Sequence, residues 1–366
     1  MRIVVLSDDA VSNMPGGIGI TSRDLIVNLA KIKKYEIIVF FANTKDLDLS
    51  WVPKNVLVNQ TLFGRRLLYK LIFPILKIDL SFFVKFDRMI DPLSQSYVPS
   101  RKKSYHIIHD FFPEQFKDKF SLISRKYRSH NFKKLINKNK IIITPSDFTA
   151  NKSLEYGFKL KNIFTIKWGY DINNSYDIKK IRQNIIDLKN EQSFLFIGRN
   201  DSRKNTARLF LAYKSLVANK KYSNTCLILC GSQDFYVDKF FEEKIISKNI
   251  IQLGYINDDE KSFLLTYSQA FIYPSLIEGF GVPILECFAH NTPIICSNTS
   301  SMLEIGGNVP YYFNPNSSSE LINQMVKILD PSFNSTKDQM VKKGYSRLKR
   351  FTWDEYLNKL MFLLDD

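Results

Sequence analysis

Short apolar runs alternate with helix-length segments along the whole chain, and this alternation restricts the possible folds more than any other feature. The runs are rich in Val, Ile, Leu and Phe. They occupy residues 3–7, 36–42, 105–111, 141–146, 194–199, 225–231, 250–256, 270–275 and 293–297. Continuous apolar strands separated by helices are typical of parallel sheets covered on both faces. Two successive sets predict an α/β chain of two Rossmann-like, doubly wound domains.

The distribution of charge indicates where one domain ends. A chain of 366 residues is longer than one hydrophobic core usually stabilises, so two domains are expected. Residues 1–170 hold 29 Lys and Arg against 14 Asp and Glu, so they carry nearly all of the net charge of +16. The turn-rich segment 168–174 follows. We therefore expect an N-terminal domain over residues 1–172 and a second domain over residues 173–350.

Apolar runs and cysteines indicate the cellular compartment of the protein. No apolar run is long enough to span a bilayer, and the first residues lack the apolar core of a signal peptide. We therefore expect a cytoplasmic protein. Two of the four cysteines lie in the strand-like TCLILCG (225–231), without partners at zinc-binding spacing, so buried reduced thiols are expected.

The basic half of the chain indicates a polyanionic partner: anionic lipid, nucleic acid or a phosphorylated substrate. Segment 62–90 mixes Arg and Lys with Leu, Ile, Phe and Tyr. It fits either an element on an anionic membrane surface or a core helix broken at Pro74, and the charge bias slightly favours the membrane. A nucleic-acid-binding protein is disfavoured, because the basic runs match no recognition module.

The stretch SLIEGFGVPILECFAHN (275–291) carries the most specific chemistry. It follows a predicted buried strand, and ligands of parallel sheets bind at that end of the strands. Pro283 suits the first turn of a helix. Backbone amides at the start of this helix would bind a diphosphate. These are the amides of Gly279, Phe280, Gly281 and Val282.

Two carboxylates flank this predicted anion site. Glu286 lies one turn into the helix, where it would accept hydrogen bonds from a ribose diol, and Glu278 precedes the glycines. Both would repel a phosphate unless each pairs with hydroxyls or a cation. This arrangement points to a nucleotide that carries a polyol, which means a nucleotide-sugar.

Other strand ends supply further candidate residues. Arg199 and Lys204, in FIGRNDSRKN (196–205), would supply positive charge for a diphosphate and for the leaving group. Gly16 and Gly17, in GGIG (16–19), follow the first strand and open a helix, so they are either a second wall for the phosphates or a plain turn. His109, beside Asp110, would orient a sugar hydroxyl or an acceptor.

These motifs resemble those of the retaining glycosyltransferases of family 4. The family's E-x7-E pattern is similar to EGFGVPILE (278–286), and its G-R…K-N stretch to GRNDSRKN (198–205). GGIG, the His-Asp pair, TPSDFT (144–149), WGYD (168–171) and FTW (351–353) align in the family's order. Asn291 stands where the family commonly has Gly, and Ile20-Thr21 where many members have Arg-Tyr.

The resemblance implies the GT-B fold, with a C-terminal helix of about residues 351–366 returning to the first domain. It implies Arg199 and Lys204 on the donor diphosphate, Glu286 on the ribose, and Glu278 with the amides of 279–282 on the sugar and phosphate. Gly17 would approach the phosphates and His109 the sugar or acceptor. No metal or other cofactor is implied, because the donor's own phosphate takes the acceptor proton.

The resemblance also implies the partners: a nucleotide-sugar donor and a glycan acceptor, lipid-linked at the inner face of the membrane. Ser300 and Ser301 match a run common among mannosyl- and rhamnosyltransferases, so GDP-mannose is the first expectation for the donor. UDP- and dTDP-sugars remain alternatives. A GT-B epimerase or phosphorylase is also open, although no pyridoxal-binding lysine is identifiable.

Overall fold

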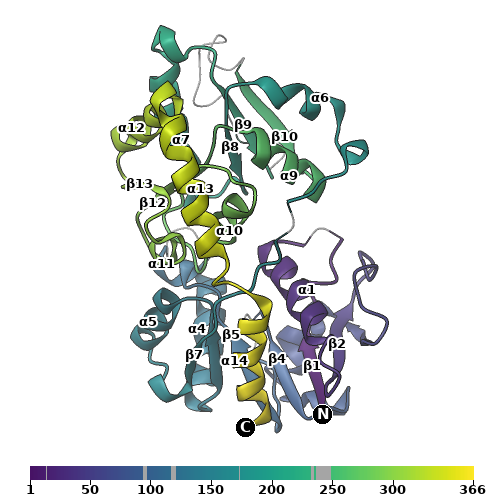
Figure 1. Ribbon diagram of the computed structural model, residues 1–366. Helices are drawn as coiled ribbons and strands as arrows, with labels where there is room; N and C mark the ends of the chain where they lie inside the picture. Colours follow the sequence, from purple (N-terminus) through teal and green to yellow (C-terminus); the bar gives the residue numbers. More distant parts are fainter. Residues whose placement is uncertain (14, 94–96, 117–120, 173, 232–234, 236–248) are drawn as a thin grey trace. The chain divides into compact units, whose positions relative to one another are not determined.

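Two parallel sheets organise the chain (Figure 1). The computed structural model describes residues 1–13, 15–93, 97–116, 121–172, 174–231, 235 and 249–366. Residues 1–169 and 353–366 form unit 1, and residues 170–352 form unit 2. The predicted division at 172/173 lies three residues from the observed one.

Unit 1 contains a seven-stranded sheet with the order β3-β2-β1-β4-β5-β6-β7. Its strands are β1 (Arg2–Leu6), β2 (Glu36–Asn43), β3 (Leu57–Gly64), β4 (Arg88–Asp91), β5 (Lys103–Ile107), β6 (Ile141–Thr144) and β7 (Ile163–Thr165). The central strand β1 is buried from Ile3 to Leu6. The chain builds outward from β1 in one direction and then resumes at β4 on its other side, so the strand order reverses between β1 and β4.

Helices and two apolar clusters complete unit 1. The longer helices are α1 (Gly17–Leu29), α4 (Leu122–Asn137), α5 (Asp147–Glu155) and α14 (Trp353–Asp365), and the shorter ones are α2 (Arg65–Leu67), η1 (Leu68–Ile72), η2 (Leu80–Phe82), α3 (Phe112–Gln115) and η4 (Leu160–Asn162). One cluster joins β1, β2 and β4 to segment 68–86, and the other joins β6 to α4. Near the end of α14, Asp365 accepts a hydrogen bond from Tyr35, 2.8 Å away, and the Leu364 carbonyl accepts one from Arg88.

Unit 2 contains a six-stranded sheet with the order β10-β9-β8-β11-β12-β13. Its strands are β8 (Ser193–Ile197), β9 (Cys226–Cys230), β10 (Ile250–Gly254), β11 (Ala270–Tyr273), β12 (Ile294–Ser297) and β13 (Tyr311–Phe313). Its helices are η5 (Ile178–Lys180), α6 (Gln183–Ile186), η6 (Asp187–Asn190), η7 (Ser202–Lys204), α7 (Thr206–Val217), η8 (Lys220–Tyr222), α9 (Asp258–Tyr267), α10 (Val282–Ala289), α11 (Ser301–Gly306), α12 (Ser318–Leu329), η10 (Pro331–Phe333) and α13 (Asn334–Leu348). All four cysteines are buried and free, as expected.

The predicted two-sheet α/β architecture is confirmed, and the differences are local. The sequence patterns missed β3, β4, β7 and β13. β3, β7 and β13 are edge strands, so one side of each lacks a partner and the apolar signal is weak. The C-terminal helix expected over about residues 351–366 is α14, which begins at Trp353 after α13 has ended at Leu348. Between them, the carbonyl of the buried Phe351 accepts a hydrogen bond from the Tyr170 amide.

Segment 62–90 has both buried and exposed apolar side chains. Its buried side chains, which include Leu68, Ile72 and Phe73, belong to the core of unit 1. Several other apolar side chains are exposed, with Leu62 at 91% and Phe82 at 79% of their full accessible surface. The expected membrane contact stays a prediction. Among the described residues, no helix is both long enough and apolar enough to cross a membrane.

Candidate functional site

The candidate site of unit 2 lies where its strand order reverses. β8 and β11 are adjacent in the sheet, although β9 and β10 separate them in the sequence. The loop after β8 leads through η7 into α7, and the loop after β11 leads into α10. In open parallel sheets, ligands bind outside the carboxyl ends of the strands at such a reversal. The fold therefore brings the two most specific sequence motifs to one place.

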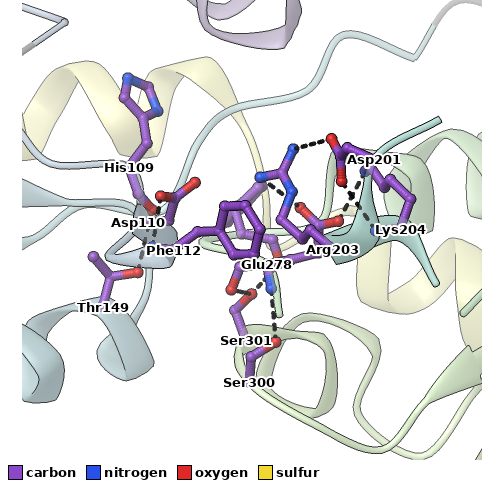
Figure 2. A network of polar contacts seen from close by, with 11 residues as sticks. His109, Asp110, Phe112, Thr149, Asp201, Arg203, Lys204, Glu278, Ser300 and Ser301 are labelled. Atoms are coloured by element: carbon purple, nitrogen blue, oxygen red, sulfur yellow. Dashed lines mark hydrogen bonds and ion pairs between the residues drawn. The ribbon is translucent and has the colours of Figure 1, made fainter. Parts of the chain in front are cut away.

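Lys204 and Glu278 meet at this position, although 74 residues separate them in the sequence (Figure 2). The Lys204 Nζ lies 2.8 Å from the Glu278 Oε1, and both side chains are largely buried. Lys204 also lies over the ring of Tyr273, with its Nζ 5.2 Å from the ring centroid. The turn that carries Lys204 is capped by Asp201, whose carboxylate accepts a hydrogen bond from the Lys204 amide. The position of Lys204 is thus fixed by the hydrogen bond between its amide and Asp201 and by its ion pair with Glu278.

Arg203 is a second cation at Glu278, and the sequence motifs did not single it out. Its Nη1 lies 3.8 Å from the Glu278 Oε2, and its Nη2 lies 3.9 Å from Asp201 (Figure 2). Burial raises the pKa of the Glu278 carboxyl, but Lys204 and Arg203 outweigh burial, so the pKa lies below its ordinary value. Glu278 is therefore a carboxylate at neutral pH.

Arg199 lies just beyond the C-terminal end of β8, the position that the sequence indicated, and its role stays a prediction. Its side chain is exposed at the end of β8. Arg203 rather than Arg199 pairs with Glu278 in the structure. Arg203 directly precedes Lys204, so the signal that could have identified it is this pair of adjacent basic residues in a short turn.

The glycine loop enters α10 in a backbone conformation that suits only glycine. Gly281 is the N-cap residue and has φ +117°. An L side chain rarely adopts this conformation. Pro283 lies in the first turn, as predicted. At the other end of α10, Asn291 has φ +58°. Asn is the residue that best replaces Gly in this left-handed region, which explains the departure from the family's glycine.

Glu286 is paired with a cation that the sequence patterns missed. Its Oε1 lies 3.0 Å from the Nζ of Lys261 in α9, which also lies 3.1 Å from Asp258. Glu286 raises the pKa of Lys261, against the opposing effect of burial. Each motif glutamate thus has a lysine partner, as expected for carboxylates beside an anion site. Lys261 lies in no recognised motif, and only the three-dimensional arrangement reveals it.

In unit 1, Gly16 and Gly17 lie at the start of α1. Gly16 is the extended N-cap residue, and a Cβ added to Gly17 would have nothing within 4 Å. A Cβ at Gly19 would instead lie 2.5 Å from the carbonyl oxygen of Asp9. Internal packing therefore requires glycine at Gly19, whereas the open space at Gly17 is available to a ligand.

His109, also in unit 1, is held firmly in the loop after β5. Its Nε2 lies 2.7 Å from the Pro92 carbonyl oxygen, so this nitrogen carries the hydrogen. The ring stacks on Trp168, which in turn stacks on Tyr356 of α14. Burial lowers the pKa of His109. The ring is therefore neutral at pH 7, and its Nδ1 can accept a hydrogen bond from a hydroxyl group.

Comparison with known proteins agrees with this geometry. Residues 177–347, which cover both motif loops of unit 2, match the family described as glycosyl transferases group 1. The match indicates that the chain is a glycosyltransferase. The glycosyltransferase is 26% identical to O-antigen chain mannosyltransferase B from Escherichia coli over 271 residues, which are 70% of this chain and 69% of that protein. It is also 26% identical to O-antigen chain mannosyltransferase RfbU from Salmonella typhimurium, over 60% of this chain and 58% of that protein.

Solved structures show the same GT-B fold as this glycosyltransferase. Sucrose-phosphate synthase from Thermosynechococcus elongatus superimposes with a TM-score of 0.77 at 18% identity, over 100% of this chain and 98% of that one. Anabaena HepE, solved with UDP and glucose, superimposes with a TM-score of 0.74 at 17% identity, over the whole of both chains. Within the described residues, no cluster of His, Cys, Asp or Glu could hold a metal ion. The expected metal-free reaction stays a prediction.

Proposed function

We propose that this glycosyltransferase moves a hexose from a nucleotide-sugar to a glycan with retention of anomeric configuration. The observation that carries the proposal is the Lys204–Glu278 pair beside the N-terminus of α10, at the reversal of strand order. A buried cation, backbone amides and a helix N-terminus together suit a diphosphate. A carboxylate at the same position suits the hydroxyl groups of a sugar.

In this proposal each motif residue binds one part of the donor. Lys204, assisted by Arg199 and by Arg203, stabilises the diphosphate as negative charge develops on the leaving group. Glu278 binds the transferred sugar, and Glu286, oriented by Lys261, binds the ribose. The amides of residues 279–282 contact the phosphates. Of the unit 1 candidates, Gly16 and Gly17 would contact the phosphates, and His109 would contact the sugar or the acceptor.

The side chains of the site fit a reaction without a protein nucleophile or general base. Glu278 is ion-paired, and its lowered pKa makes it a weak proton acceptor. Burial lowers the pKa of His109, so this ring is a weak proton acceptor too. The acceptor proton would then pass to the donor's own phosphate, and no metal ion would be required.

GDP-mannose is the donor that we propose first. Two relatives, aligned over 69% and 58% of their own length, are named O-antigen chain mannosyltransferases, and these names support a polysaccharide acceptor. A UDP-sugar is the alternative, because a structural neighbour was solved with UDP and glucose. A dTDP-sugar is a further alternative donor.

A lipid-linked acceptor would bring this protein to the membrane, and unit 1 has a surface of matching chemistry. We call it the 62–82 surface. Its exposed apolar residues are Leu62, Phe63, Leu67, Leu71, Ile75, Leu76 and Phe82, and its exposed basic residues are Arg66, Lys70 and Lys77. Phe83 joins its two ends, since this ring packs against both Phe63 and Phe82. Exposed apolar side chains interspersed with lysine and arginine fit an anionic bilayer.

Liposome flotation tests the membrane surface. The double variant Leu62→Ser with Phe82→Ser, and separately Arg66→Glu with Lys70→Glu, should each reduce binding to vesicles with 30% anionic lipid by at least about thirtyfold. Two basic residues contribute about 2 kcal/mol near such a surface, and two apolar side chains buried in the bilayer contribute at least as much. Arg65 is not a suitable target, because it pairs with Asp9 at 2.9 Å. Leu211→Ser, at an exposed leucine of unit 2, is the matched control. Unchanged binding by both double variants would place the membrane contact elsewhere.

A thermal-shift screen tests the donor class. GDP, UDP, dTDP and their sugars are each added to the purified protein. A ligand that binds only the folded state at 100 times its dissociation constant stabilises that state by about 2.7 kcal/mol. We expect one base to raise the melting temperature well above the other two. If no nucleotide raises it, the proposed function is wrong.

A further inference from the structure

Two serines from another loop hold the backbone of the glycine loop in place. The Ser300 Oγ accepts a hydrogen bond from the Glu278 amide at 3.0 Å. The Ser301 Oγ lies 2.8 Å from the Glu278 carbonyl oxygen and 2.7 Å from the Phe280 carbonyl oxygen, and these two acceptors share its single hydroxyl hydrogen (Figure 2). Ser301 is fully buried. The two hydroxyls therefore fix the amide and the carbonyl of Glu278 and the carbonyl of Phe280.

This contact determines where the neighbouring amides point. In a trans peptide unit the C=O and the N–H point in opposite directions, and the described chain contains no cis peptide bond. The Glu278 carbonyl shares its peptide unit with the Gly279 amide, and the Phe280 carbonyl shares its unit with the Gly281 amide. Since both carbonyls face Ser301, both amides face the opposite side. Backbone amides that converge on one side of a loop can form an anion-binding concavity.

The backbone of Ser300 has a conformation that is unfavourable for serine. Ser300 has φ +54° and ψ −142°. These angles lie close to a region that essentially only glycine occupies, and residues held there cluster at functional sites. Glycine would fit this backbone without strain, but it has no hydroxyl to accept the Glu278 amide. Ser300 thus combines an unfavourable backbone conformation with a hydroxyl that contacts the candidate site.

We propose that Ser300 and Ser301 are positioning residues, which set the amides of Gly279 and Gly281 for the sugar-bearing phosphate of the donor. This inference rests on the proposed function. The phosphate is the distal one, because Glu286 lies one turn into α10 on the ribose side, whereas the two amides adjoin Glu278 on the sugar side. Neither serine need touch the donor.

Isothermal titration with a nucleoside diphosphate and its monophosphate tests this role. GDP, UDP and dTDP are titrated into the wild type, and the tightest is used with its monophosphate. Ser301→Ala should weaken diphosphate binding about tenfold, as expected for misplacing one or two hydrogen bonds, and monophosphate binding less than about twofold. A role in general stability alone would weaken both equally.

Ser300→Gly keeps the inference testable if Ser301→Ala does not fold. It removes the strained side chain, so the melting temperature should stay the same or rise while diphosphate binding still falls. Ser215→Ala is the control, since it removes a hydroxyl that donates to a backbone carbonyl within α7. Wild-type diphosphate affinity in Ser300→Gly, or equal losses for both nucleotides in Ser301→Ala, would overturn the inference but leave the proposed function intact. No nucleotide binding by the wild type would overturn both.

Discussion

Lys261 of α9 and Glu286 of α10 form a largely buried ion pair, with 3.0 Å between Nζ and Oε1. The pair joins two helices of unit 2 and fixes the carboxylate that we propose for the ribose. Its desolvated position distinguishes it from the surface ion pairs of the chain.

Removal of Lys261 should destabilise the protein, because Glu286 would keep its charge without a partner. We expect Lys261→Met to lower the free energy of unfolding by about 2 kcal/mol, between the values for exposed and fully buried pairs. Urea denaturation measures this change. The control is Lys359→Met, which removes an exposed partner of Glu355 in α14 and should cost less than about 0.5 kcal/mol. Equal losses of unfolding free energy in the two variants would show that the Lys261–Glu286 pair stabilises the protein no more than an exposed ion pair does.

The ion pairs of Glu278 should make stability depend on pH in the acid range. Its pKa is lowered in the folded state, so its contribution is complete above the ordinary value of 4.5 and is lost as pH falls through the folded value. The difference in unfolding free energy between the wild type and Glu278→Gln should therefore be largest near pH 7 and shrink below pH 4. Urea denaturation at pH 7, 5, 4 and 3 gives this difference. A difference that stays constant over this series would contradict the assignment.

The sequence predicted the sheets and the two motif loops because both have local signals. Apolar runs mark the strands, and glycine, proline and glutamate mark the loop after β11. It could not identify Lys261, Ser300 or Ser301 as parts of the same site. Each becomes relevant only because strand order brings distant loops together: Lys261 meets Glu286 from a neighbouring helix, and Ser301 meets Glu278 across 23 residues. The edge strands β3, β7 and β13 were missed because few of their residues are buried.

The Tyr356 hydroxyl should contribute nothing to stability. Tyr356 is fully buried, and its hydroxyl has no hydrogen-bond partner among the described residues. Tyr356→Phe should therefore leave the free energy of unfolding unchanged or raise it by about 1 kcal/mol. Tyr213→Phe is the control, because its hydroxyl donates to the Thr225 carbonyl at 2.8 Å, and it should cost about 1 kcal/mol. A larger loss of unfolding free energy for Tyr356→Phe than for Tyr213→Phe would show that the Tyr356 hydroxyl does have a stabilising partner.

Asn291 should tolerate glycine but not alanine. At φ +58° a Cβ-bearing residue without a polar side chain is strained by about 1–2 kcal/mol. We expect Asn291→Ala to lower the melting temperature and Asn291→Gly to leave it the same or raise it. Differential scanning calorimetry of both variants tests this order, and the reverse order would be inconsistent with the left-handed end of α10.

The most direct test of the central claim measures turnover of the donor. Nucleoside diphosphate release from the nucleotide-sugar selected by the thermal-shift screen is followed with a membrane extract that contains lipid-linked acceptor. We expect Lys204→Ala and Glu278→Ala each to reduce turnover by at least about 10²-fold, the size of effect seen when one electrostatic contact to a transition state is removed. Lys327→Ala, at an exposed lysine of α12, should match the wild type. Wild-type turnover in Lys204→Ala and Glu278→Ala would show that this pair does not bind the donor.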